Sequence, residues 1–486
     1  MRRCRIASWA ALLVPLAVYV VSLDGAIGFW DVGEMQTVPY ILGIAHPTGF
    51  PAFVLLGWLF SHLVPVGTVA MRMALMCALA MSTAAWLVAR IVSERTHSAW
   101  IGTACAWLFA FGQIAWTRGT RTEIHALATL FVALTIYCAL RWYETRDSKY
   151  LIAGALAWGL GIATHPVVAL LGLGLFVLLI ARWQTLDLRA VGLSLAVFAL
   201  GCSLYMYLPI RSAQVSAAHL DPTVALGIAA GRPFWNYDRP STRAGFMKLV
   251  SGSDFDVSGG LRSIFSPQIY VAKGPGYVAS VVAEFTPIGA ALIVVGLFVL
   301  FRTDWPLAAG VTLAGFLSVP FALGYPPEAD IARYFLSSFV VCAVCIGIGV
   351  DWLAGRARIA FARPAGVALL MAIAAFAVVT QRDTFNQRND PGAQPLIASV
   401  SRLTPNDAIL IAPWIYATPL AYAAYVEHGL GGRTLDAAWL QDDAALVPYW
   451  SRSRPVYVVG IVFGSVPGYT LKPVGGNPTI YAIVKR

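Results

Sequence analysis

The chain has 486 residues, of which 58% are hydrophobic and only 12% are charged. Soluble globular proteins carry about 25% charged residues, so this composition excludes an ordinary soluble enzyme and indicates a polytopic membrane protein. The net charge of +10 is carried largely by arginines in short loops between apolar runs, and it therefore gives no indication of nucleic-acid binding.

Apolar runs near the ~20 residues needed to cross a bilayer recur along most of the chain. We predict about eleven transmembrane helices, within a range of ten to thirteen. They lie near residues 6–23, 69–89, 99–116, 124–140, 150–164, 167–181, 190–208, 277–301, 305–323, 334–353 and 364–380. The runs 150–164 and 167–181 are short, so they are also compatible with a tilted hairpin.

The positive charges predict how these helices are oriented, because short loops rich in Lys and Arg stay on the cytoplasmic side. With the N-terminus inside, the inner segments carry fourteen Lys and Arg residues and the short outer loops carry three. The outer segments are then 24–68, 117–123, 209–276, 324–333 and 381–486. All seven cysteines fall in the inner tail or in predicted spans, and no Cys and His spacing suggests a zinc site.

The apolar run 51–65 is an exception in this pattern. If it crossed the membrane, every later loop would change side and the charge bias would be reversed. We therefore predict that it forms an interfacial helix within the first outer loop.

Two domains are predicted. Residues 1–380 form the transmembrane domain, with a first outer loop at 24–68 and a long outer loop at 209–276. Residues 381–486 form a small extracytoplasmic α/β domain without a glycine-rich phosphate loop, which favours binding or positioning over catalysis. Its strands are expected at 408–412, 455–463, 471–474 and 479–486, and its helices at 417–429 and 437–450.

The polar residues of the first outer loop are the first candidates for chemistry. Asp31 and Glu34 are three residues apart, so a helix would place both carboxylates on one face, where one can accept a proton from a hydroxyl group. The alternative is that they only cap a short surface helix. His46 lies between prolines that restrict the backbone, which suits a ligand-binding histidine; a solvent-exposed loop histidine is the alternative.

Further ionisable residues gather at the predicted outer ends of the spans. Such groups are costly at the membrane boundary unless they face water or protein. The bland alternatives are snorkelling arginines, a structural histidine and an anchoring arginine at a helix end. The residues concerned are Arg118, Arg121, Glu123, His125, His165, Arg211, Glu328, Asp330 and Arg333. Guanidinium groups bind phosphate in a bidentate manner, so this face suits a substrate whose anionic head is tethered to lipid.

The order of these motifs resembles the GT-C glycosyltransferases of the protein O-mannosyltransferase type. The shared motifs are Asp-x-Gly-Glu at 31–34, Gly-Ile-x-His-Pro-x-Gly-Phe-Pro at 43–51, a Glu that begins a span and a His that ends one. More closely, they resemble the domain family of unknown function 2723, which is transmembrane-protein-260-like. The match covers residues 24–211 well, and 234–252 is similar to the family's Trp-Gly-Asp-Pro-Ser-Thr segment.

The resemblance implies a GT-C-like fold and an inverting, single-displacement transfer of a hexose or pentose. The donor would be a polyprenyl-phosphate-linked sugar, and the acceptor a hydroxyl of a protein, glycan or lipid. By position, Asp31 is the expected catalytic carboxylate, with Glu34 beside it. The expected substrate-binding residues are His46, Arg118, Arg121, Glu123, His165 and Arg211. Among these, the arginines and His165 are expected to bind the lipid phosphate.

The chain departs from the family's motifs at four positions, which affects donor and acceptor identity more than reaction type. These are Thr48, Phe50, His125 in place of a common tyrosine, and Ala163 in place of an asparagine. No metal ligand is assigned, although a carboxylate pair can hold a divalent cation and the superfamily contains both metal-dependent and metal-free members. The expected location is a bacterial inner membrane, with the N-terminus cytoplasmic and the site facing the other side.

Two other functions are compatible with such a sequence. A transporter or flippase for lipids or lipid-linked sugars would have ionisable groups through the depth of the bilayer, whereas the predicted spans are nearly free of acids. A scaffold protein would use the tail to recruit a partner.

Overall fold

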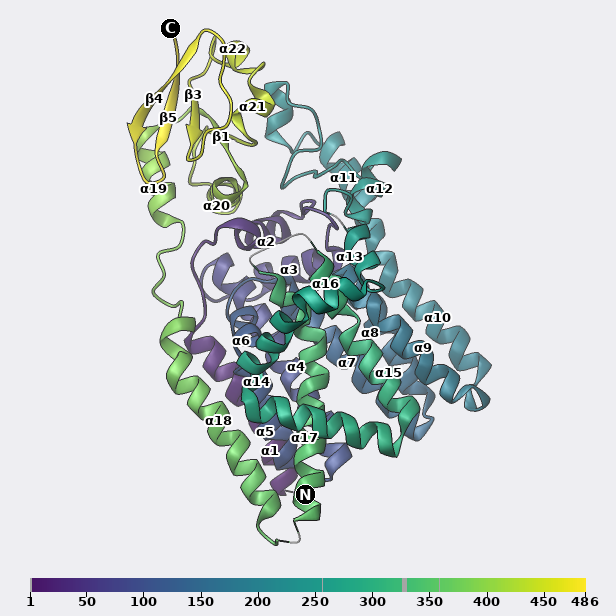
Figure 1. Ribbon diagram of the computed structural model, residues 1–486. Helices are drawn as coiled ribbons and strands as arrows, with labels where there is room; N and C mark the ends of the chain where they lie inside the picture. Colours follow the sequence, from purple (N-terminus) through teal and green to yellow (C-terminus); the bar gives the residue numbers. More distant parts are fainter. Residues whose placement is uncertain (1, 256, 326–329, 358) are drawn as a thin grey trace. The chain divides into compact units, whose positions relative to one another are not determined.

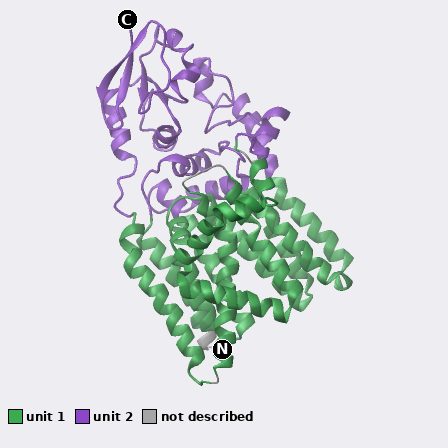
Figure 2. Ribbon diagram, in the orientation of Figure 1, with its two compact units in different colours: residues 1–23, 75–204, 255–387 green, residues 24–74, 205–254, 388–486 purple. Residues whose placement is uncertain are grey.

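The computed structural model describes residues 2–255, 257–325, 330–357 and 359–486, and most of them are helical (Figure 1). Two compact units are distinguished in Figure 2. The helical unit consists of residues 1–23, 75–204 and 255–387. The sheet unit consists of residues 24–74, 205–254 and 388–486.

Every segment that the sequence predicts to span the membrane is helical. The helices are α1 (Arg2–Val21), α4 (Val69–Thr96), α5 (Ala99–Ala110), α6 (Gln113–Thr120), α7 (Ile124–Thr145), α8 (Ser148–Thr164), α9 (Gly172–Ala181), α10 (Leu188–Cys202), α14 (Pro267–Thr303), α15 (Trp305–Phe316), α16 (Ser318–Gly324), α17 (Leu336–Arg356) and α18 (Ala362–Phe385). Among the described residues, seven helical stretches are long and apolar enough to cross a membrane, or eight if the bent pair α5 and α6 counts as one. The remaining apolar helices are shorter, so the predicted number of spans is not settled by length.

Burial distinguishes central from peripheral helices within the helical unit. Residues Ile331–Arg356, which end with α17, have 78% of their most apolar segment buried in protein, whereas the corresponding value for α18 is 11%. In Figure 1, α18 runs along the edge of the helical unit. Since α18 is apolar but covers little protein surface, its outer face requires an apolar surrounding. This pattern supports an integral membrane protein.

The first loop and the long loop contribute helices to the sheet unit. These are α2 (Trp30–Ile41), α3 (Pro51–Leu63), α11 (Tyr207–Ala217) and α12 (Arg243–Ser251), with the 3₁₀ helix η4 (Pro222–Leu226). The run predicted as an interfacial helix is α3, whose 13 residues are too short to cross a bilayer. Its helical structure is confirmed, and its position along the membrane surface stays a prediction.

The tail contains a five-stranded sheet in the order β2-β1-β3-β5-β4. Strands β1 (Ile409–Ala412), β2 (Thr434–Ala437) and β3 (Val456–Val459) are parallel, while β4 (Tyr469–Gly475) and β5 (Ile480–Lys485) form an antiparallel edge. Helices α19 (Gln394–Leu403), α20 (Trp414–Tyr425), α21 (Leu440–Asp443) and α22 (Val447–Trp450) connect or cover the strands. Strand β2 was not predicted, and the helix expected at 437–450 is two short helices.

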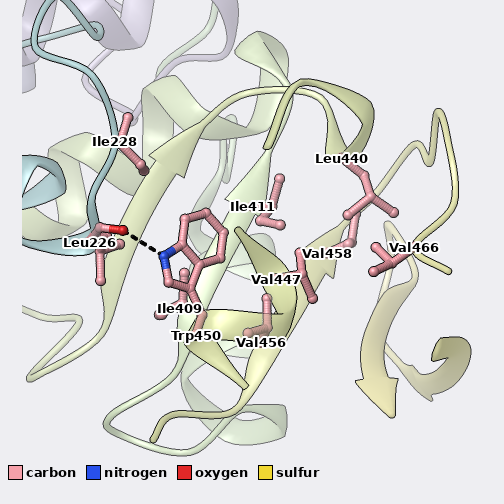
Figure 3. Packing of buried hydrophobic residues seen from close by; sticks show 10 residues of the cluster. All are labelled: Leu226, Ile228, Ile409, Ile411, Leu440, Val447, Trp450, Val456, Val458 and Val466. Atoms are coloured by element: carbon pink, nitrogen blue, oxygen red, sulfur yellow. Dashed lines mark hydrogen bonds between the residues drawn. The ribbon is translucent and has the colours of Figure 1, made fainter. Parts of the chain in front are cut away.

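The core of the sheet includes residues from the long loop. Trp450 donates its indole N–H to the carbonyl oxygen of Leu226 at 2.7 Å, and Leu226 and Ile228 pack with Ile409 and Val458 (Figure 3). The compact unit that holds the tail thus also contains residues 205–254. The domain boundary at residue 381 stays a prediction.

A buried carboxyl group in β2 makes the stability of this sheet depend on pH. Asp436 is 0% exposed, and its carboxyl group lies near that of Asp443. Burial, followed by the nearby Asp443 carboxylate, raises the pKa of Asp436 to about 8. A raised folded-state pKa stabilises the fold below the unfolded value of about 4, and this contribution is lost as the pH rises toward about 8.

We expect Asp436→Asn to weaken this loss of stability between pH 5 and pH 8.5, because the amide is neutral throughout. The measurement is hydrogen exchange of the β1 and β2 amides in the detergent-solubilised full chain at several pH values. Asp407→Asn, at an exposed aspartate of the same domain, is the matched control and should keep the wild-type pH dependence. The same pH dependence in Asp436→Asn would contradict the assignment.

Candidate active site

Helix α2 brings the two predicted carboxylates to one part of the sheet unit. Asp31 lies in its first turn, where the helix dipole favours a negative charge, and Glu34 follows one turn later with no exposed surface. The Asp31 Oδ1 atom accepts a hydrogen bond from the indole N–H of Trp414 at 3.1 Å. Trp414 begins α20 directly after β1, so the tail contacts the candidate catalytic carboxylate.

Gly33 explains how α2 comes so close to α20. A Cβ atom at this position would lie only 3.0 Å from the Thr418 carbonyl carbon and 3.1 Å from the Pro419 nitrogen. A glycine between the two carboxylates therefore lets the backbones approach, and this contact sets Trp414 against Asp31.

Glu34 fixes the position of His46. Its Oε1 atom accepts the backbone N–H of His46 at 2.8 Å, and its Oε2 atom contacts the His46 Nδ1 atom directly. Burial raises the pKa of Glu34 above its ordinary value, and the charge of the His46 imidazole opposes part of that rise. The pair is thus arranged to share a proton at a buried position.

Asp31, Glu34 and His46 each offer one ligand atom, and these atoms lie within 4.8 Å of one another. Two carboxylates and an imidazole suit a zinc or manganese ion as well as a proton relay. The direct contact between Glu34 and His46 satisfies both groups without an ion.

Aromatic residues of the long loop complete this part of the site. Phe234 stacks on Trp414 with ring centres 5.7 Å apart, and its carbonyl oxygen accepts the backbone N–H of Ile44 at 3.0 Å. Tyr237 contacts Trp414 edge to face, and burial and the Glu34 charge raise the pKa of Tyr237. The segment 234–252, singled out by resemblance, thus places Phe234 and Tyr237 beside Trp414, the partner of Asp31.

Arg211 lies in the same unit and contacts the C-terminal end of α2, opposite the end that carries Asp31. Its Nε atom donates to the carbonyl oxygen of Leu42 at 2.6 Å, and a terminal nitrogen donates to that of Ile41 at 3.2 Å. These are carbonyl groups that a helix end leaves without intrahelical partners. The structure shows Arg211 stabilising the end of α2, and its predicted contact with a phosphate stays untested.

A second cluster of predicted residues lies in the helical unit. Arg118, at the end of α6, is 2% exposed and donates to the Glu123 Oε2 atom at 2.8 Å. The other Glu123 oxygen is 3.0 Å from the His125 Nδ1 atom, and the His125 and His165 rings lie 4.6 Å apart. Arg121 lies 3.7 Å from the Glu123 carboxylate.

Asp330 joins this cluster from a distant part of the sequence. It precedes the 3₁₀ helix η5 (Ile331–Phe335), and its carboxylate contacts both Arg118 and Arg121. The structure thus brings Arg118, Arg121, Glu123 and Asp330 into contact, with His165 beside His125. Glu328, which was grouped with them, lies outside the described residues.

Glu284 is a residue that sequence reasoning missed. It lies in α14, and its carboxylate accepts the backbone N–H groups of Ile114 at 2.9 Å and Ala115 at 3.2 Å. These donors form the N-terminus of α6, at the 73° bend between α5 and α6. A single acid within the apolar run 277–301 was the available signal. Glu284 stabilises the short helix that carries Arg118.

We expect Glu284→Gln to destabilise the helical unit by about 1–3 kcal/mol. The amide has only one acceptor oxygen, and its NH₂ group would face a backbone N–H group of α6, which is also a donor. Thermal unfolding of the detergent-solubilised protein measures the effect. Glu144→Gln removes a carboxylate from a partly exposed ion pair with Arg95, and it should cost less than about 1 kcal/mol. Equal losses for the two variants would contradict the assigned role of Glu284.

Comparison with known proteins identifies relatives of the membrane part of the chain. Residues 31–187 match the family model described as the protein O-mannosyl-transferase TMEM260 N-terminal domain. The chain is 32% identical to the protein O-mannosyl-transferase TMEM260 of Mus musculus over 208 residues, 40% of this chain and 29% of that protein. It is 23% identical to the corresponding Dictyostelium discoideum protein over 378 residues, 70% of this chain and 43% of that protein. The chain thus spans less than half the length of these relatives.

Solved structures share the fold at low sequence identity. ArnT from Cupriavidus metallidurans matches with a TM-score of 0.57 in the apo state, at 13% identity, with 97% of both chains covered. The same protein bound to undecaprenyl phosphate matches with a TM-score of 0.58 at 12% identity, again with 97% of both chains covered. Arabinofuranosyltransferase AftD from mycobacteria matches with a TM-score of 0.51 at 12% identity, covering all of this chain and 40% of AftD.

Proposed function

We propose that this chain, which has the GT-C fold and a TMEM260-type N-terminal domain at residues 31–187, is a membrane glycosyltransferase. It would move a sugar from a polyprenyl-phosphate-linked donor to a hydroxyl acceptor. The observation that carries the proposal is the Asp31 carboxylate, oriented by Trp414 within a motif that the family model matches. Its relatives are named O-mannosyl-transferases, and one ArnT structure holds undecaprenyl phosphate.

Asp31 would act as the general base. The acceptor hydroxyl oxygen attacks the anomeric carbon, the bond from that carbon to the phosphate oxygen breaks, and the phosphate leaves with the bonding electrons. Asp31 takes the proton of the acceptor hydroxyl group while the hydroxyl oxygen forms its bond to the anomeric carbon. Because the acceptor attacks opposite the leaving phosphate, a single displacement inverts the configuration. The Trp414 hydrogen bond fixes the orientation of the carboxylate before the acceptor arrives.

Glu34 and His46 would serve the acceptor side. Their direct pair sits in the same short segment as Asp31, and a proton shared between them keeps the buried carboxylate from carrying an uncompensated charge. The His46 ring is held against Phe50 and Trp414, so its position is rigid. A rigid imidazole can orient a hydroxyl for transfer.

Arg118 and Arg121 would bind the donor phosphate. Guanidinium groups remain charged and match the geometry of phosphate oxygens, so they can stabilise the charge that develops on the leaving group. Glu123 holds Arg118 from the buried side. His165 and Arg211 complete the proposed donor set, although Arg211 also supports α2.

The sugar transferred, hexose or pentose, the acceptor and the inverting course are parts of the proposal. The extracytoplasmic position of the site is likewise proposed, from the distribution of positive charges, and a bacterial inner membrane is part of the same proposal. The transporter alternative requires ionisable groups through the depth of the spans. Glu284 is such a group, but its carboxylate is occupied by backbone N–H groups of α6, so it does not support a transport path.

We expect Asp31→Asn to lower kcat by about 10²–10⁴-fold, because the amide cannot accept the hydroxyl proton. Donor affinity should change little. The assay is transfer from a polyprenyl-phosphate sugar by purified protein in detergent or nanodiscs. Asp24→Asn, seven residues earlier in the same loop, is the matched control and should retain activity. Near-normal turnover of folded Asp31→Asn would remove Asp31 from the mechanism.

Removing one guanidinium from the second cluster tests the donor site. We expect Arg121→Gln to raise the KM for the donor about tenfold, through loss of a charge-assisted hydrogen bond to phosphate. Arg141→Gln, at an arginine paired with Glu94 elsewhere in the helical unit, should leave the KM unchanged. If both variants have the wild-type KM, Arg121 does not contact the donor.

A further inference from the structure

The two arginines of the donor cluster hold an acidic side chain of the protein itself. Each Asp330 oxygen faces a different guanidinium: Oδ1 contacts Arg118, and Oδ2 is 2.9 Å from Arg121. Phosphate oxygens accept the same charge-assisted hydrogen bonds from guanidinium groups that these carboxylate oxygens accept. Asp330 thus occupies the position of an anionic ligand.

The two carboxylates of the cluster differ in exposure. The Glu123 side chain is 9% exposed and also contacts His125, whereas the Asp330 side chain is 36% exposed. The cost of separating an ion pair depends on how far its members are buried, and a half-exposed carboxylate can recover hydration when it leaves. Glu123 is therefore the fixed partner of Arg118, and Asp330 is the exchangeable one.

The arginines retain capacity for another acceptor. The Nε atoms of Arg118 and Arg121 are buried and have no hydrogen-bond partner among the described residues. Buried donors without partners are costly, and they indicate a ligand that would complete them. Asp330, with two oxygens already placed on the terminal nitrogens, does not satisfy these atoms.

We propose that the Asp330 carboxylate competes with the lipid phosphate for Arg118 and Arg121. It binds the two guanidinium groups when the phosphate leaves them. This inference rests on the proposed function. The donor is a phosphodiester with one negative charge, whereas the polyprenyl phosphate released by transfer is a monoester with a charge of about −1.5 to −2 at pH 7. The product therefore binds two guanidiniums more tightly than the donor, and return of Asp330 favours its release.

The test measures binding of undecaprenyl phosphate to the purified full chain by native mass spectrometry or a fluorescence titration. We expect Asp330→Asn to lower the Kd about fivefold, the size of a half-exposed ion pair that no longer competes. Product inhibition of transfer should increase by a similar factor. Asp351→Asn, which removes a carboxylate paired with Arg363 at 2.9 Å, is the matched control and should keep the wild-type Kd.

The opposite result would identify Asp330 as a support for the arginines. In that case Asp330→Asn would bind undecaprenyl phosphate more weakly than the wild type, or with equal affinity, and the inference would be wrong. Thermal unfolding of the same samples shows whether the variant is folded, and Asp330→Ala repeats the measurement without the amide.

A separate measurement distinguishes failure of this inference from failure of the proposed function. If Arg121→Gln weakens binding of undecaprenyl phosphate while Asp330→Asn does not strengthen it, the donor site stands and the competition is refuted. If the wild-type protein and Arg121→Gln bind the lipid equally, the donor site itself is refuted.

Discussion

The hydrogen bond from Trp414 to Asp31 is the interaction on which the candidate active site depends. It joins the first loop to the start of α20, and β1 ends two residues before that helix begins. Gly33 lets α2 approach α20, and Phe234 from the long loop stacks on the same indole ring. Three segments far apart in sequence therefore meet at one carboxylate, and Trp414 is placed there by a helix that follows the central strand β1.

Buried charge imposes the second constraint. A carboxylate or guanidinium removed from water must be paired or hydrogen-bonded, and this chain satisfies the requirement in different ways. Glu34 is paired with the His46 ring, Arg118 is paired with Glu123, and Glu284 accepts backbone N–H groups at the start of α6. Each pairing fixes a side chain or helix end, so the polar groups proposed for catalysis are oriented before a substrate binds.

The helices were predictable because their signal is local. An apolar run of sufficient length forms a helix in a membrane regardless of what it packs against, and each of the predicted runs is helical in the structure. Strands β1, β3 and β5 were found for a similar reason, as short apolar runs between turn residues. Strand β2 was missed because only two of its four residues are apolar and one of the others is the buried Asp436, so it does not read as an apolar run.

Hydropathy was enough to predict a polytopic helical membrane protein, and the motif order was enough to predict a GT-C-like fold and to select Asp31, Glu34 and His46 as candidate site residues. Hydropathy and short motifs are properties of adjacent residues, so they survive without knowledge of the fold. The contacts of Trp414 with Asp31, of Arg211 with the end of α2, and of Asp330 with Arg118 and Arg121 are visible only in the folded chain. These contacts join residues far apart in the chain, and no local pattern specifies which buried donor will meet which acceptor.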